Sequence, residues 1–118
     1  MTKGIGVDIV DIRRIEKALL KENFKSRILN ESEIQLFRKS ESIAGVFAAK
    51  EAASKALGLG FARGISFLDF EVLKDEAGKP FMALSGKAMQ RFIDISARNI
   101  LISIAHEKDY AICYCIIE

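Results

Sequence analysis

The sequence contains few of the residues that build disulfide frameworks, zinc sites or flexible linkers. It has two cysteines, one histidine, one proline and no tryptophan among 118 residues, and no low-complexity tract. Cys113 and Cys115 alternate within an apolar run, which places both thiols on one face of an expected strand. Their Cα atoms would lie ~6.6 Å apart, near the upper limit for a disulfide, so we expect two free, buried thiols. Two cysteines alone are also too few ligands for a zinc site.

Long hydrophobic runs are absent as well, and so is a strong charge of either sign. No segment approaches the ~18 apolar residues of a membrane-spanning helix. The first ten residues, "MTKGIGVDIV", lack the apolar core of a signal peptide. The formal net charge is +2, which gives no overall field suited to nucleic acid. We therefore expect a cytoplasmic protein that binds neither membrane nor nucleic acid.

The hydrophobic pattern predicts an α+β fold in a single domain, residues 1–118. Helical patterns dominate the first half and strand patterns the second, which favours a mainly antiparallel sheet packed on helices. The expected helices run over 11–21, from "NESEIQLF", over 42–58 and from a cap at Ser85. The expected strands are 4–10, a hairpin over 68–84, and two closing strands.

The long helix has an unusual composition in the stretch "FAAKEAASKALG", where alanines surround Glu51 and Lys55. Alanine is the best helix former, and a Glu–Lys pair four residues apart stabilises an exposed helix by only about 0.2–0.5 kcal/mol. Ala44, Ala48 and Ala52 recur at every fourth position and would permit close approach of another chain. The stretch is therefore either a solvated helix face or a site where ligand or subunit comes close.

Asp8 lies in the first expected strand, where an unpaired buried charge is costly. In the structural interpretation it lies at a strand edge, where it reaches solvent or bonds to backbone amides. In the functional interpretation it is a ligand of a hard cation. The second role requires another carboxylate from elsewhere in the fold, and Glu51 is the candidate.

Two further features allow both a structural and a functional interpretation. His106, the only histidine, shares strand parity with three isoleucines and either ends an apolar face or contacts an anionic ligand. Arg14, Lys17 and Lys21 form a basic stripe within residues 13–27, where six basic residues stand against two acidic ones. Such a stripe is either a solvated face or a surface for an acidic partner.

Four blocks of the sequence carry a family resemblance: "GIGVDIVDIRRIEK", "FAAKEAASKALG", "ISFLDFEVLKDEAGKP" and "SIAHEKDYA". In this order they resemble the holo-[acyl-carrier-protein] synthases, the small bacterial type of 4'-phosphopantetheinyl transferase. The resemblance spans nearly the whole chain and implies the 4'-phosphopantetheinyl transferase-like fold. It also implies transfer of phosphopantetheine from coenzyme A to a serine of acyl carrier protein, with release of adenosine 3',5'-bisphosphate.

The resemblance further implies roles for individual residues. Asp8 and Glu51 match the magnesium ligands, and Lys55 matches a lysine near the coenzyme A phosphates, so Glu51 and Lys55 are the expected catalytic residues. His106 matches a histidine near the nucleotide. Arg14 matches a contact to the carrier protein, and the stripe adds Lys17 and Lys21. Family members are homotrimers with sites shared between subunits.

One position departs from the family pattern. The arginine that often precedes "FAAKE" is Val46 here, so a cationic phosphate contact is missing or replaced. This favours, as an alternative, a non-catalytic trimeric module that binds coenzyme A or carrier protein. A magnesium-dependent hydrolase of nucleotide pyrophosphates is a third possibility.

Overall fold

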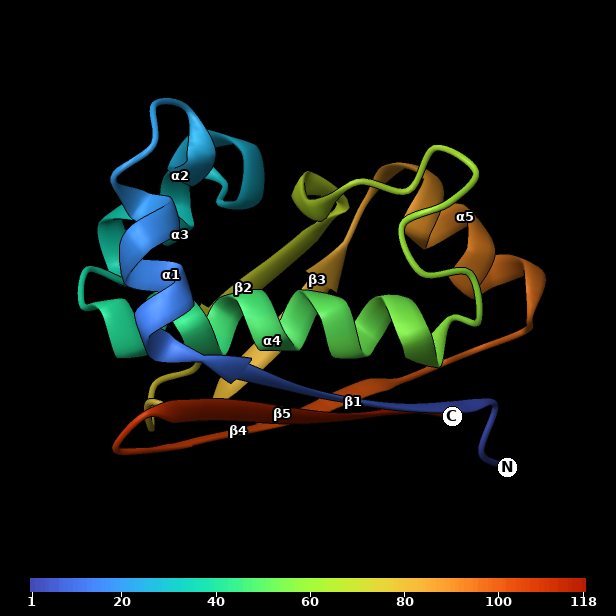
Figure 1. Cartoon of the computed structure of the whole chain (residues 1–118). Coiled ribbons are helices and arrows are strands. Elements are labelled where there is room, and N and C mark those ends of the chain that lie inside the picture. The colour runs from blue at the N-terminus through green and yellow to red at the C-terminus, as the bar shows by residue number, and fades with distance from the viewer.

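A long helix lies on one face of a three-stranded antiparallel sheet, and these two layers form the centre of the molecule (Figure 1). The computed structural model describes residues 1–118. The helix is α4 (Ser40–Ala56), and the strand order is β1-β5-β4. Strands β1 (Gly4–Asp11) and β4 (Ile100–Glu107) form the edges, with β5 (Tyr110–Ile117) between them.

Strand β5 supplies much of the face that packs on the helix layer. Its side chains alternate between exposed and buried, and the buried set is Ala111, Cys113, Cys115 and Ile117. Both cysteines are free and buried, which confirms the prediction from their spacing.

The opposite face of the same sheet has no covering element, and Figure 1 shows helices on one side only. Large hydrophobic side chains from all three strands are exposed there: Ile5, Val7, Ile9, Leu101, Ile112 and Tyr114. We call this set the open sheet face. An apolar surface of this extent on a folded chain indicates a contact with another molecule.

Three short helices precede α4 and lie near its N-terminal end: α1 (Ile12–Leu19), α2 (Phe24–Ile28) and α3 (Glu31–Leu36). Asp11 caps α1 by accepting a hydrogen bond from the Arg13 backbone at 2.9 Å, as its position predicts. Helix α1 ends at Leu19, two residues earlier than expected. The backbone N–H groups that follow bond to the carbonyl three residues earlier, in place of four. Helix α2 was not expected.

The second half of the chain forms the predicted hairpin and a final helix before the closing strands. A short 3₁₀ turn, η1 (Phe67–Asp69), leads into β2 (Phe70–Lys74), which pairs with β3 (Pro80–Leu84). Helix α5 (Gly86–Asp94) follows and lies toward the C-terminal end of α4 (Figure 1). The α+β class and the antiparallel pairing are confirmed. None of the helices has the length and apolar character needed to cross a bilayer.

Candidate active site

Two glycines allow β1 to lie directly against α4. A Cβ atom at Gly4 would lie 1.9 Å from the Ala56 carbonyl oxygen, and one at Gly6 would lie 2.0 Å from that of Ala52. These contacts are with backbone, so no side-chain movement could relieve them. Asp8 follows on the same face of the strand and therefore points toward the helix at this close junction.

The close approach explains the alanines of α4. Ala44, Ala48 and Ala52 are fully buried within the chain. Of the three, Ala52 meets the protein's own β1 strand at Gly6. The expectation that the stripe admits a neighbouring subunit was wrong, because all three alanines are already buried within one chain.

Asp8 and Lys55 meet at the junction although 47 positions separate them. The Lys55 ammonium donates to Asp8 Oδ1 and to the Val7 carbonyl oxygen, both at 3.1 Å. The side chain of Lys55 is 51% exposed and that of Asp8 is 16% exposed. Lys55 thus reaches across to the strand and forms no ion pair with Glu51, so the solvated Glu–Lys pair is not the arrangement found.

Glu51 lies close enough to Asp8 for their charges to interact. Burial raises the pKa of the Glu51 carboxyl above its ordinary value, the negative charge of Asp8 raises it further, and Lys55 opposes both effects. No third histidine, cysteine or carboxylate joins this pair. Two partly buried carboxylates with a single neighbouring ammonium form a site at which additional positive charge would be favourable.

His106 lies on β4, at the far edge of the sheet from Asp8. It pairs with Ala111 of β5, which in turn pairs with Val10 of β1, so a whole strand separates the histidine from β1. The side chain of His106 is exposed. Within one chain, His106 is therefore not brought to the carboxylate pair.

The basic stripe is exposed. It lies beyond the C-terminal end of β1. Arg14 and Lys17 line a shallow depression of about 270 Å³ together with Asp11 and Arg13. Arg13 is held by the Asp11 carboxylate at 3.2 Å, which leaves Arg14 and Lys17 as the cations without an ion-pair partner there. Lys21 follows the end of α1 and is also exposed.

Comparison with known proteins identifies the family. A model of the 4'-phosphopantetheinyl transferase superfamily matches residues 4–115. The holo-[acyl-carrier-protein] synthase of Clostridium botulinum strain Alaska E43 is 50% identical over 123 residues, which cover 100% of this chain and 98% of that protein. The chain belongs to the holo-[acyl-carrier-protein] synthase family. The Vibrio cholerae O395 member is 46% identical over 124 residues, which cover 100% of this chain and 98% of that protein.

Solved structures of the family have the same fold. The Helicobacter pylori holo-[acyl-carrier-protein] synthase in complex with coenzyme A has a TM-score of 0.88 and 40% identity, over 97% of this chain and 99% of that one. The Neisseria meningitidis enzyme has a TM-score of 0.90 and 29% identity, over 100% and 99% of the two chains. The 4'-phosphopantetheinyl transferase-like fold is thereby confirmed.

Val46, where the family resemblance leads one to expect arginine, is fully buried on α4. It precedes Lys50 by one helical turn, and Lys50 is buried as well. Val46 therefore contributes packing and no charge.

The structure also contains two groups near the site that sequence reasoning missed. The rings of Phe24, Phe47, Phe67 and Phe61 stack in a row, with successive centroids 6.5, 5.2 and 4.1 Å apart. Phe47 lies one turn before Glu51 on α4, so this phenylalanine row comes next to Glu51 at Phe47. All four rings are only partly buried. The one sequence signal for this row was the position of Phe47, four residues before Glu51.

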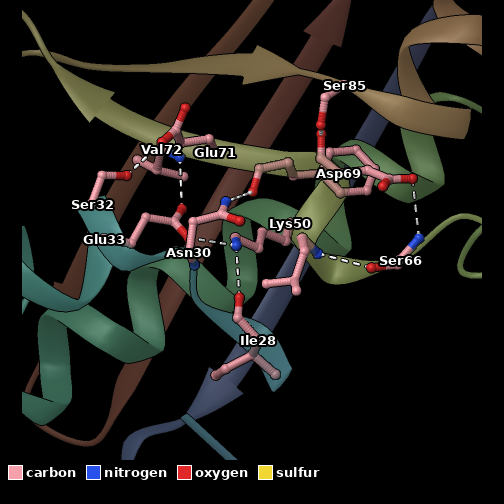
Figure 2. A network of polar contacts seen from close by, with 12 residues as sticks. Ile28, Asn30, Ser32, Glu33, Lys50, Ser66, Asp69, Glu71, Val72 and Ser85 are labelled. Atoms are coloured by element: carbon pink, nitrogen blue, oxygen red, sulfur yellow. Dashed lines mark hydrogen bonds and ion pairs between the residues drawn. The ribbon is translucent and has the colours of Figure 1, made fainter. Parts of the chain in front are cut away.

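The second group is a buried polar network around Lys50 and Glu33, drawn in Figure 2. Asn30 and Glu33 have the spacing of a capping box, and they form one at the start of α3. The pairing of Glu33 with Lys50 had no local signal, because the two residues lie on different helices.

Proposed function

We propose that this protein transfers the 4'-phosphopantetheine group from coenzyme A to a serine of acyl carrier protein in a magnesium-dependent reaction. The observation that carries the proposal is the meeting of Asp8, Lys55 and Glu51 at the β1–α4 junction. A relative that covers almost the whole chain was solved with coenzyme A, which supports the same substrate here.

The residues at the junction fit a magnesium ion. Asp8 and Glu51 offer carboxylate oxygens from two different elements, which is the donor type that Mg²⁺ prefers. Magnesium commonly uses one or two carboxylates and completes its shell with water and substrate phosphates, so the lack of a third carboxylate suits it. When bound, the ion supplies neutralisation of the negative charge on the pyrophosphate.

The chain's own residues then position and stabilise the reacting groups. The serine oxygen of the carrier attacks the phosphorus attached to pantetheine, and the bond from that phosphorus to the bridging oxygen of adenosine 3',5'-bisphosphate breaks. Lys55, half exposed beside Asp8, can turn its ammonium from the carboxylate to a phosphate oxygen. The candidates to accept the serine proton are Glu51, Asp8 and bound water.

We propose further that the basic stripe and the phenylalanine row receive the carrier protein. Arg14 and Lys17 offer unpaired positive charge to an acidic partner, and such charge raises the association rate. Phe47 adds an apolar surface one helical turn from Glu51. A substrate of protein size can contact both. The expected cytoplasmic location stays a prediction.

A homotrimer with sites between subunits is also part of the proposal. The open sheet face exposes Ile9 to 63% and Val7 to 46%, and burial of this surface against other copies would remove it from water. His106 lies a whole strand from Asp8, so a second chain is the simplest way to bring a histidine to the carboxylate pair.

The test of assembly is Val7→Asp, which adds a charge to the open sheet face in the middle of edge strand β1 and leaves the α4 side of β1 unchanged. Light scattering should give three times the chain mass for the wild type and the mass of one chain for the variant. A wild type that is monomeric at micromolar concentration and fully active would contradict the shared site.

The test of the reaction is incubation with coenzyme A, magnesium and apo-carrier protein, followed by mass spectrometry of the carrier. We expect a mass increase equal to one phosphopantetheine group, and none with Asp8→Asn or Glu51→Gln. Binding of coenzyme A without any mass increase would favour the non-catalytic module, which the buried Val46 makes the second candidate. Cleavage of coenzyme A without a carrier protein would indicate a hydrolase.

A further inference from the structure

Lys50 and Glu33 form an ion pair that is completely removed from solvent. The Lys50 ammonium lies 2.7 Å from Glu33 Oε1, and both side chains are 0% exposed. Lys50 directly precedes Glu51 on α4, so the buried pair is adjacent along the helix to a residue of the proposed site.

The pair ties four segments together (Figure 2). Lys50 also donates to the Ile28 carbonyl oxygen at the end of α2, at 2.6 Å. Glu33 Oε1 accepts from the Asn30 backbone at the start of α3, at 2.8 Å, and Oε2 accepts from the Val72 backbone of β2, at 2.7 Å. No buried polar side-chain atom is left without a partner.

The attraction between the two charges does not by itself explain such a pair. Burial of two charges carries a large desolvation penalty, and apolar residues of similar volume often stabilise a fold equally well or better. Burial lowers the pKa of Lys50 in spite of the opposing effect of Glu33, which is the mark of that penalty. A fully satisfied pair does, however, fix the relative placement of the groups it joins.

The directions of the side chains around α4 show what is fixed. Successive helical residues point about 100° apart, so Lys50 and Ala52 point to nearly opposite sides and Glu51 points between them. On the Ala52 side, β1 approaches so closely that Gly6 has no room for a Cβ atom. On the Lys50 side lies the buried ion pair. Helix α4 is thus held from two opposite sides, and Glu51 projects from the gap between the two contacts.

We propose that the Glu33–Lys50 pair is a positioning device for the reaction, which sets the rotation of α4 about its axis and thereby the placement of the Glu51 carboxylate relative to Asp8. The inference rests on the proposed function, because Glu51 is taken as a metal ligand. A carboxylate roughly 6 Å from the helix axis moves about 1 Å when the helix rotates by about 10°, and shifts of that size are enough to impair a metal or catalytic site.

The decisive variant replaces both charges by apolar residues of similar size, Glu33→Leu with Lys50→Met. Mn²⁺ is titrated into the wild type and the variant without coenzyme A, thermal unfolding is recorded, and transfer is measured with magnesium and carrier protein varied in turn. We expect the variant to be folded but less stable, because the Asn30 and Val72 backbone N–H groups and the Ile28 carbonyl lose their partners. Mn²⁺ binding is therefore measured well below its unfolding midpoint. We expect its Mn²⁺ dissociation constant to rise roughly tenfold, as for the loss of residues that orient metal ligands. The apparent Michaelis constant for magnesium should rise with it, and that for carrier protein should not.

Two further variants separate positioning from general destabilisation. Ile43→Val removes one methyl group from the core on the same helix, two turns before Lys50, and it should leave Mn²⁺ affinity unchanged. Glu33→Gln keeps the size of the side chain and an acceptor oxygen, and it replaces the double variant if that protein does not fold. Its Mn²⁺ affinity should fall in the same direction.

The outcomes are distinguishable. A folded variant, double or Glu33→Gln, that binds Mn²⁺ as tightly as the wild type would overturn the positioning role while leaving the transferase proposal intact. A wild type that binds no Mn²⁺ and transfers nothing would overturn the proposed function itself, and the positioning role with it.

Discussion

Lys55→Met should have opposite effects on metal binding and on transfer. Without substrate, the Lys55 ammonium occupies Asp8 Oδ1 at 3.1 Å and also bonds to the Val7 carbonyl. A metal ion that binds Asp8 has to displace this ammonium and bind beside its positive charge. Methionine keeps the unbranched shape of the side chain up to the Cε position and removes both obstacles, so the metal should bind more tightly.

The size of the gain follows from the exposure of the pair. Lys55 is 51% exposed, so the contact belongs with solvent-screened ion pairs. Such pairs contribute about 0.2–1 kcal/mol, which corresponds to a decrease of about 1.4-fold to 5-fold in the metal dissociation constant. Transfer should change far more, because loss of one group that stabilises charge in the transition state commonly lowers kcat by about 10²–10³-fold.

The assay measures free Mn²⁺ by electron paramagnetic resonance during titration of coenzyme A-free protein, and transfer by steady-state kinetics. Lys87→Met, at an exposed lysine on α5, is the matched control and should alter neither quantity. An unchanged or weaker Mn²⁺ affinity in Lys55→Met would refute the idea that lysine and metal compete for Asp8. Unchanged transfer would refute the catalytic role of Lys55.

Three further predictions concern the docking surface, the strand–helix junction and the thiols. Arg14→Glu with Lys21→Glu should raise the Michaelis constant for carrier protein severalfold at low salt, with little effect at high salt, where screening is strong; equal constants at low salt would mean that the stripe is only solvated. Gly6→Ala should lower the free energy of unfolding in urea by at least about 2 kcal/mol, since the new methyl group would overlap a helix carbonyl; an unchanged midpoint would contradict the close approach. Burial raises the pKa of Cys113 and of Cys115 to about 12, so both stay neutral thiols across ordinary pH and should react with iodoacetamide only after unfolding. Rapid labelling of the native protein would contradict their burial.

The parts of the fold with local signals could be predicted from the sequence. The Asp11 cap, the Asn30–Glu33 capping box and the alanine-rich helix each depend on residues within one or two turns, and each is present. The burial of whole faces could not be predicted in this way. On α5 the apolar residues Met89 and Ile93 are exposed, because the face that packs inward is the one with Ala88.

The candidate site was predictable only in part. The family resemblance pointed to Asp8, Glu51 and Lys55, and the structure brings all three to one junction. Spacing alone could not pair residues 47 positions apart in the chain. The Glu33–Lys50 pair had neither a local signal nor a place in the resemblance, and it exists only because α3 and α4 pack together.

The small residues at the junction connect the fold to the proposed chemistry. The lysine of the helix reaches both a carbonyl and a carboxylate of the strand. This requires the strand and the helix to lie very close together, which is possible only if the residues between them are small. Gly6 provides this on the strand, and Ala52 and Ala48 provide it on the helix. A larger residue at any of these positions would push β1 outward and carry Asp8 with it. The alanines around Glu51 are therefore required because they allow the short distance between β1 and α4. Helix propensity by itself would not require them.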